Sequence, residues 1–336
     1  MRLVQGPPRF IRESHSSRAV MGDMLLVLLM TCVLPVVYHG WRAAWLVLFS
    51  MAVCMGCYIL FQLVTVRSIR ITDASPLITG AMIALLMPAN IPFWVVAAAD
   101  AFAILGAKEP FGGTGRTPFN PAAAGVAFVT VLWPERVFSY YSMNIGQHLT
   151  LSADSLLTTA SPAAMLRDGI QPGMMPFEML WGRYEGPMGA TSAAVLGAGL
   201  LFLLVRKSAD WRAPVCFTAA AALYAAMFPR LSMGSVISVK YELLAGSLLF
   251  CAFYMITDPC TSPRTGEGRC IWGALGGVLL MLLRCYGGFE QGACFAVLLM
   301  NTLSPLVDRA VLYCRREMRR REQSREKRRE VHVSKP

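Results

Sequence analysis

Charged residues are scarce in this chain of 336 residues: Asp, Glu, Lys and Arg together make up 15% of it, whereas soluble domains carry about a quarter. Hydrophobic residues make up 55%, and the mean hydropathy is +0.50. This composition excludes an ordinary soluble globular domain. Because long apolar runs cross a bilayer as helices, it predicts an all-α polytopic membrane protein.

Metal ligands and disulfide partners are also scarce. Only four histidines occur, scattered from His15 to His332, and none of the ten cysteines lies between residues 134 and 188. A disulfide framework in that segment is therefore excluded. Cys54 and Cys57 have the CxxC spacing, but a single pair inside an apolar stretch is more typical of small apolar residues than of a metal site or cluster. We therefore expect no metal centre.

A cleavable leader is not expected either, because the first apolar stretch lacks a small-residue cleavage site and is followed by further apolar stretches. About ten such stretches recur, most of them near the roughly 20 residues that cross a bilayer as a helix. Their ranges are 24–39, 43–64, 76–87, 91–107, 119–133, 191–205, 213–228, 241–256, 271–284 and 289–307. The third is short, so we expect a broken or partly submerged helix there.

The Lys and Arg residues that give the net charge of +11 are distributed unequally between the two sides of the membrane. With ten crossings both termini lie on one side, and most Lys and Arg residues fall on that side, in an N-terminal arm (1–23), in alternate loops and in a tail (309–336). This asymmetry places both termini in the cytoplasm and the loop 134–188 at the periplasmic face of a bacterial inner membrane. The tail is expected to be solvated and partly helical, without nucleic-acid binding.

A threonine between small residues stands where the outer loop meets the sixth apolar stretch. Thr191 follows Gly189 and Ala190, and we expect it in the first turn of a membrane helix at the periplasmic side. The first N–H groups of a helix have no internal partner and the helix dipole is positive there, so a phosphate ester on this hydroxyl would be stabilised. The small neighbours leave room for a bulky group. These residues predict a flavin phosphate attached to Thr191.

Glycine and proline crowd the predicted cytoplasmic loop 108–121, which contains Gly112, Gly113 and, just before the next helix, Asn120. Irregular backbone at membrane depth is tolerated where it is buried in protein or lines a cavity. The loop is therefore either a plain re-entrant turn that lets helices pack or part of a second ligand site, and the residues favour neither.

Two acidic residues are candidates for an ion pathway. Asp100 lies inside the fourth apolar stretch, where a carboxylate is costly and commonly functional. Asp258 stands at the end of the eighth stretch, where capping or interfacial solvation is the commoner role. Its surroundings, Ile256-Thr257-Asp258, repeat the pattern Ile71-Thr72-Asp73. Both copies fall on the cytoplasmic face, which an inverted symmetry between two halves does not explain.

Several motifs resemble a known family and follow one another in the same order. They are Thr72-Asp73-Ala74-Ser75 with Thr79-Gly80, Phe111-Gly112-Gly113-Thr114-Gly115 with Phe119-Asn120-Pro121-Ala122, Thr257-Asp258-Pro259 with Thr261-Ser262-Pro263, and the stretches 295–301 and 305–308. The family is the RnfD component of the Rnf electron-transport complex with its homologue in the sodium-pumping NADH:quinone oxidoreductase, NqrB. The similarity extends from about Arg9 to Arg309. It implies a fold like that of urea transporters, with inverted five-helix halves at 24–133 and 189–308.

The resemblance also implies a covalent cofactor. Members of the family carry FMN joined through its phosphate to a threonine in the pattern Asp-Gly-x-Ser/Thr-Gly-Ala-Thr. That pattern corresponds here to residues 185–191, which assigns the ester to Thr191. Glu185 replaces the aspartate of the pattern and Met188 replaces its hydroxyl residue.

Further cofactors and partners follow from the same resemblance. Quinone-reducing members hold riboflavin noncovalently, and the loop at Gly112 and Gly113 resembles the stretch near that flavin. The implied partners are the other Rnf proteins, RnfA, RnfB, RnfC, RnfE and RnfG, above all RnfG, which also carries covalent FMN, together with membrane lipid and a flavin transferase. The implied activity is electron transfer coupled to translocation of Na+ or H+, by a component that is not catalytic alone.

Two other functions stay open on the residues alone. A solute channel or transporter would use the same bundle and broken helices, and a scaffold would hold neighbouring proteins of a complex through its apolar surface. Neither needs a hydroxyl that can be esterified at an outer helix start. Thr191 therefore separates both from a redox component.

Overall fold

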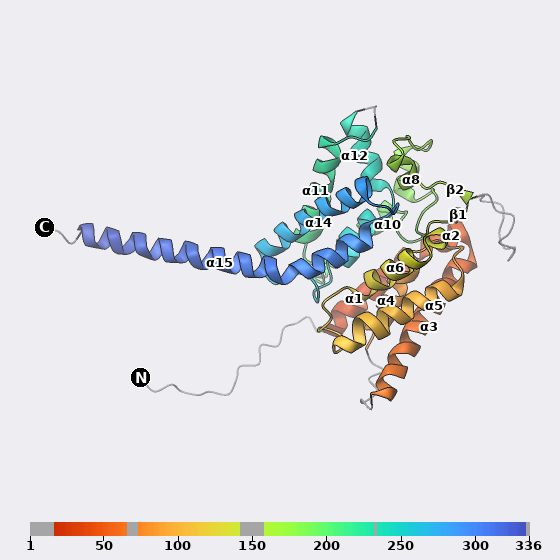
Figure 1. Ribbon diagram of the computed structural model, residues 1–336, viewed down its shortest axis with the longest axis horizontal. Coiled ribbons are helices and arrows are strands. Elements are labelled where there is room, and N and C mark those ends of the chain that lie inside the picture. Colours follow the sequence, from red (N-terminus) through yellow and green to blue (C-terminus); the bar gives the residue numbers. More distant parts are fainter. Residues whose placement is uncertain (1–16, 66–72, 142–157, 232–233, 334–336) are drawn as a thin grey trace.

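The computed structural model describes residues 17–65, 73–141, 158–231 and 234–333, and these residues are mostly helical. A helical body carries one long terminal helix that extends away from it as an arm (Figure 1). Most of the predicted N-terminal arm lies outside the described residues.

The first group of helices lies together at the lower right of Figure 1. It consists of α1 (Ser17–Thr31), α2 (Val33–His39), α3 (Trp41–Val64), α4 (Ser75–Leu85), α5 (Phe93–Ala101) with its π-helical continuation η1 (Phe102–Lys108), a short turn η2 (Glu109–Phe111), and α6 (Pro121–Leu132). Helix α4 has only 11 residues, as the short third apolar stretch predicts.

The predicted outer loop contains short elements. They are α7 (Pro134–Val137), the paired two-residue strands β1 (Tyr140–Tyr141) and β2 (Thr158–Thr159), α8 (Pro162–Arg167) and α9 (Pro176–Trp181). Ser161 caps α8 by accepting a hydrogen bond from the Ala164 amide at 3.1 Å. This part of the chain is therefore partly ordered against the body.

The second group of helices forms the upper part of the body in Figure 1. It consists of α10 (Ala193–Val205), α11 (Arg212–Met227), α12 (Ser235–Leu244), α13 (Leu248–Phe250) with η4 (Cys251–Met255), α14 (Gly266–Tyr286) and α15 (Ala293–Val333). Helices α11, α14 and α15 pack side by side.

Four helical segments are long and apolar enough to cross a membrane, namely Ser17–His39, Trp41–Val64, Gly266–Tyr286 and Ala293–Ser324, and a bent pair makes a fifth. Shorter apolar helices accompany them. Large apolar side chains face outward, including Trp41 and Leu201, as lipid-facing positions require. The chain is a helical polytopic membrane protein, while the number of ten crossings and the two inverted halves stay predictions.

The predicted apolar helix over 241–256 is broken in the structure. Helix α12 and the α13–η4 segment meet at a bend of 66°, because Ala245 is extended and Gly246 takes a left-handed φ of 65°. Arg284 of α14 stabilises the break. Its guanidinium donates to the carbonyls of Glu242 at 2.8 Å and Ala245 at 2.7 Å, which are among the carbonyls left unpaired at a helix end.

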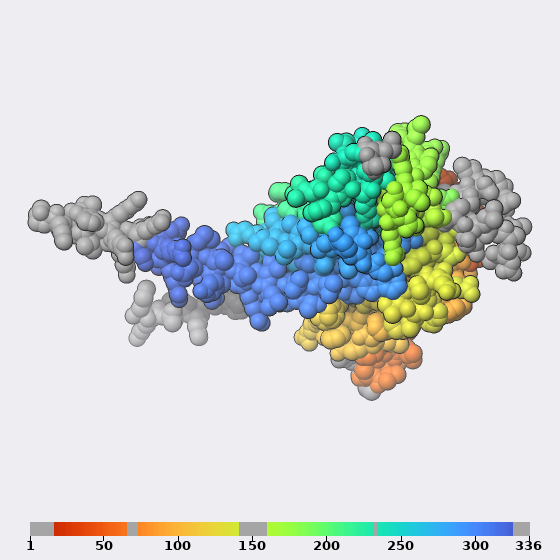
Figure 2. All heavy atoms as spheres, turned by 45° about the horizontal axis from the view of Figure 1, so that its top comes forward, coloured from red at the N-terminus to blue at the C-terminus, as the bar shows by residue number. Residues whose placement is uncertain are grey.

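The tail, which was expected to be partly helical, directly continues the last membrane helix. Helix α15 continues without interruption through Pro305 to Val333, and its exposed part stands clear of the body (Figure 2). The tail is rich in Arg and Glu, which are good helix formers. Glu317 and Arg321 add an ion pair one helical turn apart at 3.8 Å, so the membrane helix propagates into the polar sequence.

Small residues bring the helices of the body close together. A Cβ atom placed on Gly80 of α4 would lie 2.7 Å from the carbonyl oxygen of Ser50 on α3, and one on Gly125 of α6 would lie 2.6 Å from that of Ala99 on α5. Such close backbone approach is typical of helices that associate within a membrane. This close packing fixes the position of the C-terminal end of α4, whose backbone carbonyls the outer loop contacts.

Candidate functional site

The loop that precedes α10 docks on the C-terminal end of α4. The amides of Met188 and Gly189 donate to the carbonyls of Met87 at 3.0 Å and Leu85 at 2.8 Å. These two bonds pair carbonyls at the end of a helix that would otherwise lack partners. Met188 is 1% exposed and belongs to the main hydrophobic core. The loop is therefore anchored at Met188, the residue that replaces the family's hydroxyl, and at Gly189, which follows it.

Thr191 lies two residues before α10. Ser192 is the N-cap, and its Oγ accepts a hydrogen bond from the Val195 amide at 3.4 Å. The expectation that Thr191 itself lies in the first helical turn is therefore wrong by two residues, because the neighbouring hydroxyl takes the capping role. Within the described part of the chain, the Thr191 hydroxyl donates only a long bond of 3.5 Å, to the Met188 carbonyl. The side chain is 3% exposed.

Glycines surround the Thr191 side chain. A Cβ atom on Gly182 would lie 2.9 Å from both the Thr191 Oγ1 and the Ser192 amide nitrogen. A Cβ atom on Gly186 would lie 3.2 Å from the Thr191 Cγ2. Gly182 thus packs directly against the Thr191 hydroxyl and the Ser192 backbone N–H, which lie side by side. A phosphate ester needs this combination of an attachment oxygen and a neighbouring donor. The sequence pattern indicated Gly189 and Ala190, but it missed Gly182, which contacts Thr191 only through the fold.

Gly189 is predicted to be intolerant of a side chain. A Cβ atom there would lie 2.5 Å from the Cβ of Leu85, and the loop cannot retreat because the Gly189 amide bonds the Leu85 carbonyl. We expect Gly189→Ala to lower the free energy of unfolding by about 1–3 kcal/mol, as overpacking does, and to lower the melting temperature of the purified protein in detergent. Gly197→Ala is the matched control, since Gly197 lies on α10 with open space beside it. Equal melting temperatures for the two variants would contradict this account.

The second predicted ligand loop lies at the other end of α4. Gly112 and Gly113 adopt left-handed φ values of 108° and 78°, and the Gly113 amide donates to the Lys108 carbonyl at 3.2 Å. The loop reaches the N-terminal end of α4 through Lys108, whose Nζ donates to Ser75 Oγ at 2.7 Å. Because α4 has 11 residues, about 16 Å of helix separates this loop from the Thr191 loop. The structure does not bring the two predicted sites together.

Asn120 has a clear local role. Its Oδ1 accepts hydrogen bonds from the amides of Ala122 at 3.0 Å and Ala123 at 3.2 Å, so it is the N-cap of α6. With the amide of Asn301 oriented to satisfy its neighbours, the Asn301 oxygen accepts from the Asn120 backbone N–H at 2.8 Å. Asn120 thereby links the start of α6 to α15.

The repeated Thr-Asp motifs converge on a buried lysine that sequence reasoning missed. Asp73 Oδ1 accepts from the Ser75 amide at 2.9 Å, and Asp258 Oδ1 accepts from the Cys260 amide at 3.0 Å, so each begins the turn that follows it. Both carboxylates, with Glu109, lie near the ammonium of Lys108, which is 1% exposed. Burial raises the pKa of Asp258. The echo between the motifs was the signal for this cluster.

Asp100 is fully buried on α5. Its Oδ1 accepts from the Ser50 hydroxyl at 2.8 Å and from the Cys54 thiol at 3.4 Å, both on α3. Its Oδ2 has no hydrogen-bond donor among the residues that the structure describes. Asp100 and Asp258 therefore lie in different environments, one inside the bundle and one at its edge.

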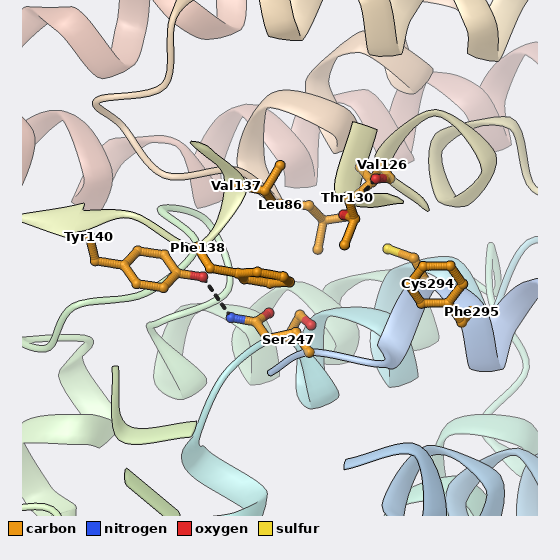
Figure 3. A pocket seen from close by; sticks show the side chains of 10 residues that line it. Leu86, Val126, Thr130, Val137, Phe138, Tyr140, Ser247, Cys294 and Phe295 are labelled. Atoms are coloured by element: carbon orange, nitrogen blue, oxygen red, sulfur yellow. Dashed lines mark hydrogen bonds between the residues drawn. The ribbon is translucent and has the colours of Figure 1, made fainter. Parts of the chain in front are cut away.

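A small cavity lies beside the end of α4, lined by Leu86, Val126, Thr130, Val137, Phe138, Tyr140, Ser247, Gln291, Cys294 and Phe295 (Figure 3). Across it the Gln291 side chain donates to the Tyr140 hydroxyl at 3.0 Å. Its volume of about 20 Å³ is enough for a water molecule. It does not accommodate a flavin ring in this conformation.

Glu290 is predicted to make stability depend on pH. It lies in the loop between α14 and α15 and accepts a hydrogen bond from Ser161, and burial raises its pKa from 4.5 to about 7. The folded chain thus holds this proton more tightly than the unfolded chain. The resulting stabilisation, on the order of 2–3 kcal/mol, is complete below pH 4.5 and is lost as the pH rises to about 7.

The melting temperature of the wild-type protein should therefore fall as the pH rises from 4.5 to about 7. We expect Glu290→Gln to remove this fall. Glu135→Gln, which changes an exposed carboxyl of α7, serves as the control and should keep the wild-type pH profile. A Glu290→Gln variant with the wild-type profile would show that another group is responsible.

The sequence of this chain is similar to a known protein family and to several of its members. The sequence model of the NQR2, RnfD, RnfE family matches residues 4–315. A relative in Acetobacterium woodii, the RnfD-type component of a Na(+)-translocating ferredoxin:NAD(+) oxidoreductase complex, is 30% identical over 308 residues, which cover 89% of this chain and 90% of the relative. The corresponding components of the ion-translocating oxidoreductase complexes of Salmonella paratyphi A and Salmonella arizonae are 30% and 31% identical, over 88% of this chain and 94% of each relative. The chain therefore belongs to the NQR2, RnfD, RnfE family.

Proposed function

We propose that this chain is the flavin-carrying membrane component of an Rnf-type ion-translocating electron-transport complex, with FMN esterified through its phosphate to Thr191. The observation that carries the proposal is the position of the Thr191 hydroxyl, beside Gly182 and the Ser192 amide and just before the N-terminus of α10. Family membership and the names of the relatives support the part of the proposal that concerns an ion-translocating oxidoreductase complex. The chain is one part of an oxidoreductase and is not catalytic alone.

The residues around Thr191 fit a phosphate. Ser192 occupies the Val195 amide, while the amides of Ala193 and Ala194, at the first two positions of α10, are free of intrahelical partners. With the positive end of the helix dipole they offer hydrogen bonds to phosphate oxygens. The two bonds from the loop to α4 hold the attachment residue at a fixed distance from the bundle. When bound, FMN supplies the electron-transfer chemistry; Thr191 is a tether and takes no chemical part in turnover.

Formation of the ester requires movement of the outer segment. The Thr191 hydroxyl is covered by Gly182, which follows α9 directly, and Tyr38 fastens that segment by donating to the Trp181 carbonyl at 3.2 Å. A flavin transferase reaches the hydroxyl only when α9 lifts away or before it packs. The same segment would lie against the bound flavin afterwards.

The proposed arrangement in the membrane follows from the sequence. Ten crossings place both termini in the cytoplasm and Thr191 at the periplasmic side, where RnfG with its own covalent FMN is the expected electron-transfer partner. The other proposed partners are RnfA, RnfB, RnfC and RnfE, with riboflavin as a second flavin near Gly112 and Gly113. Coupled translocation of Na+ or H+ would use Asp100 and Asp258.

The proposal is tested by producing the full chain with and without a flavin transferase. Membranes are separated on a denaturing gel and viewed for flavin fluorescence before staining. We expect a fluorescent band at the size of the chain only when the transferase is present. A band that stays dark despite the transferase would contradict the flavin assignment and favour a channel or scaffold.

A further inference from the structure

A row of polar side chains lies on the buried face of α3. Ser50, Cys54, Tyr58 and Gln62 follow one another at intervals of four residues, and they are 0%, 0%, 4% and 6% exposed. Residues four apart share one face of a helix, so these side chains form a continuous row. The row runs for about 18 Å, from the depth of Asp100 to the end of α3 that precedes the 66–72 loop. Apolar side chains on this buried face would pack the helices of the bundle equally well. The alignment of four polar side chains in one row therefore points to a function.

The inner end of the row is Asp100. Helix α5 lies alongside α3 and α4 (Figure 1), and the Ser50 hydroxyl bonds both Asp100 Oδ1 and the Gly80 carbonyl, each at 2.8 Å. Among the described residues no cation pairs with Asp100. A charged carboxylate in this position would be strongly unfavourable, so neutrality requires a proton or a bound cation.

The Lys108 cluster lies beside the third residue of the row. The ammonium of Lys108 lies 5.7 Å from the centre of the Tyr58 ring and bonds Ser75. The carboxylates of Asp73, Glu109 and Asp258 lie near this charge and favour it. Lys108 lies eight residues after Asp100, at the end of a π-helix, a deviation that is frequent at functional sites.

A proton fits Asp100 better than a metal cation does. The oxygens gathered there are the carboxylate, the Ser50 hydroxyl and the Gly80 carbonyl, which are fewer than hard cations usually require. The donors are a hydroxyl and a thiol, both of which relay protons. The other titratable groups near Asp100 are Cys57 on α3 and, beyond Cys54, Lys108. Helices α4 and α6 contain no titratable side chain.

We propose that Asp100 is a proton-binding site that is reached from the Lys108 cluster along Tyr58 and Cys54. Each uptake takes one proton from cytoplasmic water and converts one carboxylate to a carboxylic acid, with no other reactant. This inference rests on the ion-translocating part of the proposed function and is independent of the flavin ester.

The test uses infrared spectroscopy of the full-length chain in membranes. The difference spectrum between wild type and Asp100→Asn should contain the C=O band of a protonated carboxyl group, unchanged when Na+ replaces K+ at constant ionic strength. The protein carrying Thr191→Ala should show the same band, so failure here is distinguishable from failure of the flavin assignment. Absence of the band, from mildly acidic to mildly alkaline buffer, overturns the proposal. Loss of the band on adding Na+ overturns it in favour of a sodium site.

The route is tested by the rate at which that band shifts on transfer to D2O. Tyr58→Leu should slow the shift at least about tenfold, as expected when a relay group is removed. Leu60→Ala, a change on the opposite and 55% exposed face of α3, is the control and should leave the rate unchanged. An equal rate in wild type and Tyr58→Leu overturns the proposed route.

Discussion

Thr191→Ala is expected to abolish covalent flavin while leaving the chain folded. The substitution removes the only oxygen of the side chain, so no phosphate ester can form there. Folding should suffer little, because the hydroxyl makes one hydrogen bond of 3.5 Å and such a bond contributes at most about 1 kcal/mol. In-gel fluorescence of the chain produced with the transferase should fall to background, and the melting temperature of the flavin-free protein should stay near that of flavin-free wild type.

The neighbouring hydroxyl provides the control for this prediction. Ser192→Ala removes the N-cap of α10 and costs about 1 kcal/mol of stability, but it leaves the attachment oxygen in place. We therefore expect Ser192→Ala to remain fluorescent. Retention of fluorescence in Thr191→Ala, or its loss only in Ser192→Ala, would show that the ester is attached elsewhere.

Arg284→Met is expected to produce the largest loss of stability among the substitutions considered. Arg284 is 3% exposed and its NH1 lies 3.5 Å from the carboxylate of Glu242, which is itself 2% exposed. Removing one partner of a buried ion pair typically costs about 3–5 kcal/mol. The carbonyls of Glu242 and Ala245 at the bend also lose their donors. The melting temperature in detergent should fall by at least about 5 °C.

A second substitution separates the ion pair from general damage to the core. Glu242 also pairs with Arg230 at 3.3 Å, and the Arg230 side chain is 15% exposed. Removing the carboxylate as well, in Arg284→Met with Glu242→Leu, should recover part of the lost stability, because the charge then left unpaired, that of Arg230, is less buried than that of Glu242. Arg315→Met, which breaks an exposed pair with Glu267, should change the melting temperature little. A double variant no more stable than Arg284→Met would contradict the assigned role of the pair.

The sequence was most informative about where helices lie. Hydropathy depends on local composition, and most of the longer described helices overlap the expected apolar stretches. The bend between α12 and α13 could not be read in the same way, because Arg284, which holds it, is 39 residues beyond Ala245. The tail was expected to be partly helical, and α15 is helical as far as Val333, because Arg and Glu propagate a helix readily.

The attachment residue of the candidate site could be predicted from the sequence, whereas the residues that contact it could not. Thr191 was found from its small neighbours and its place before an apolar stretch, which are local signals. The contact of Gly182 with its hydroxyl and the docking of Gly189 on Leu85 depend on tertiary packing. The row from Ser50 to Gln62 could have been found, because its four-residue spacing is visible in the sequence.

The central claim, a flavin ester on Thr191, is tested most directly by mass spectrometry of the protein purified from its native membranes. After proteolysis, the peptide that contains Thr191 should carry the mass of FMN less one water, with fragment ions that place the addition on Thr191. An unmodified Thr191 peptide, or the same addition on another residue, would contradict the account.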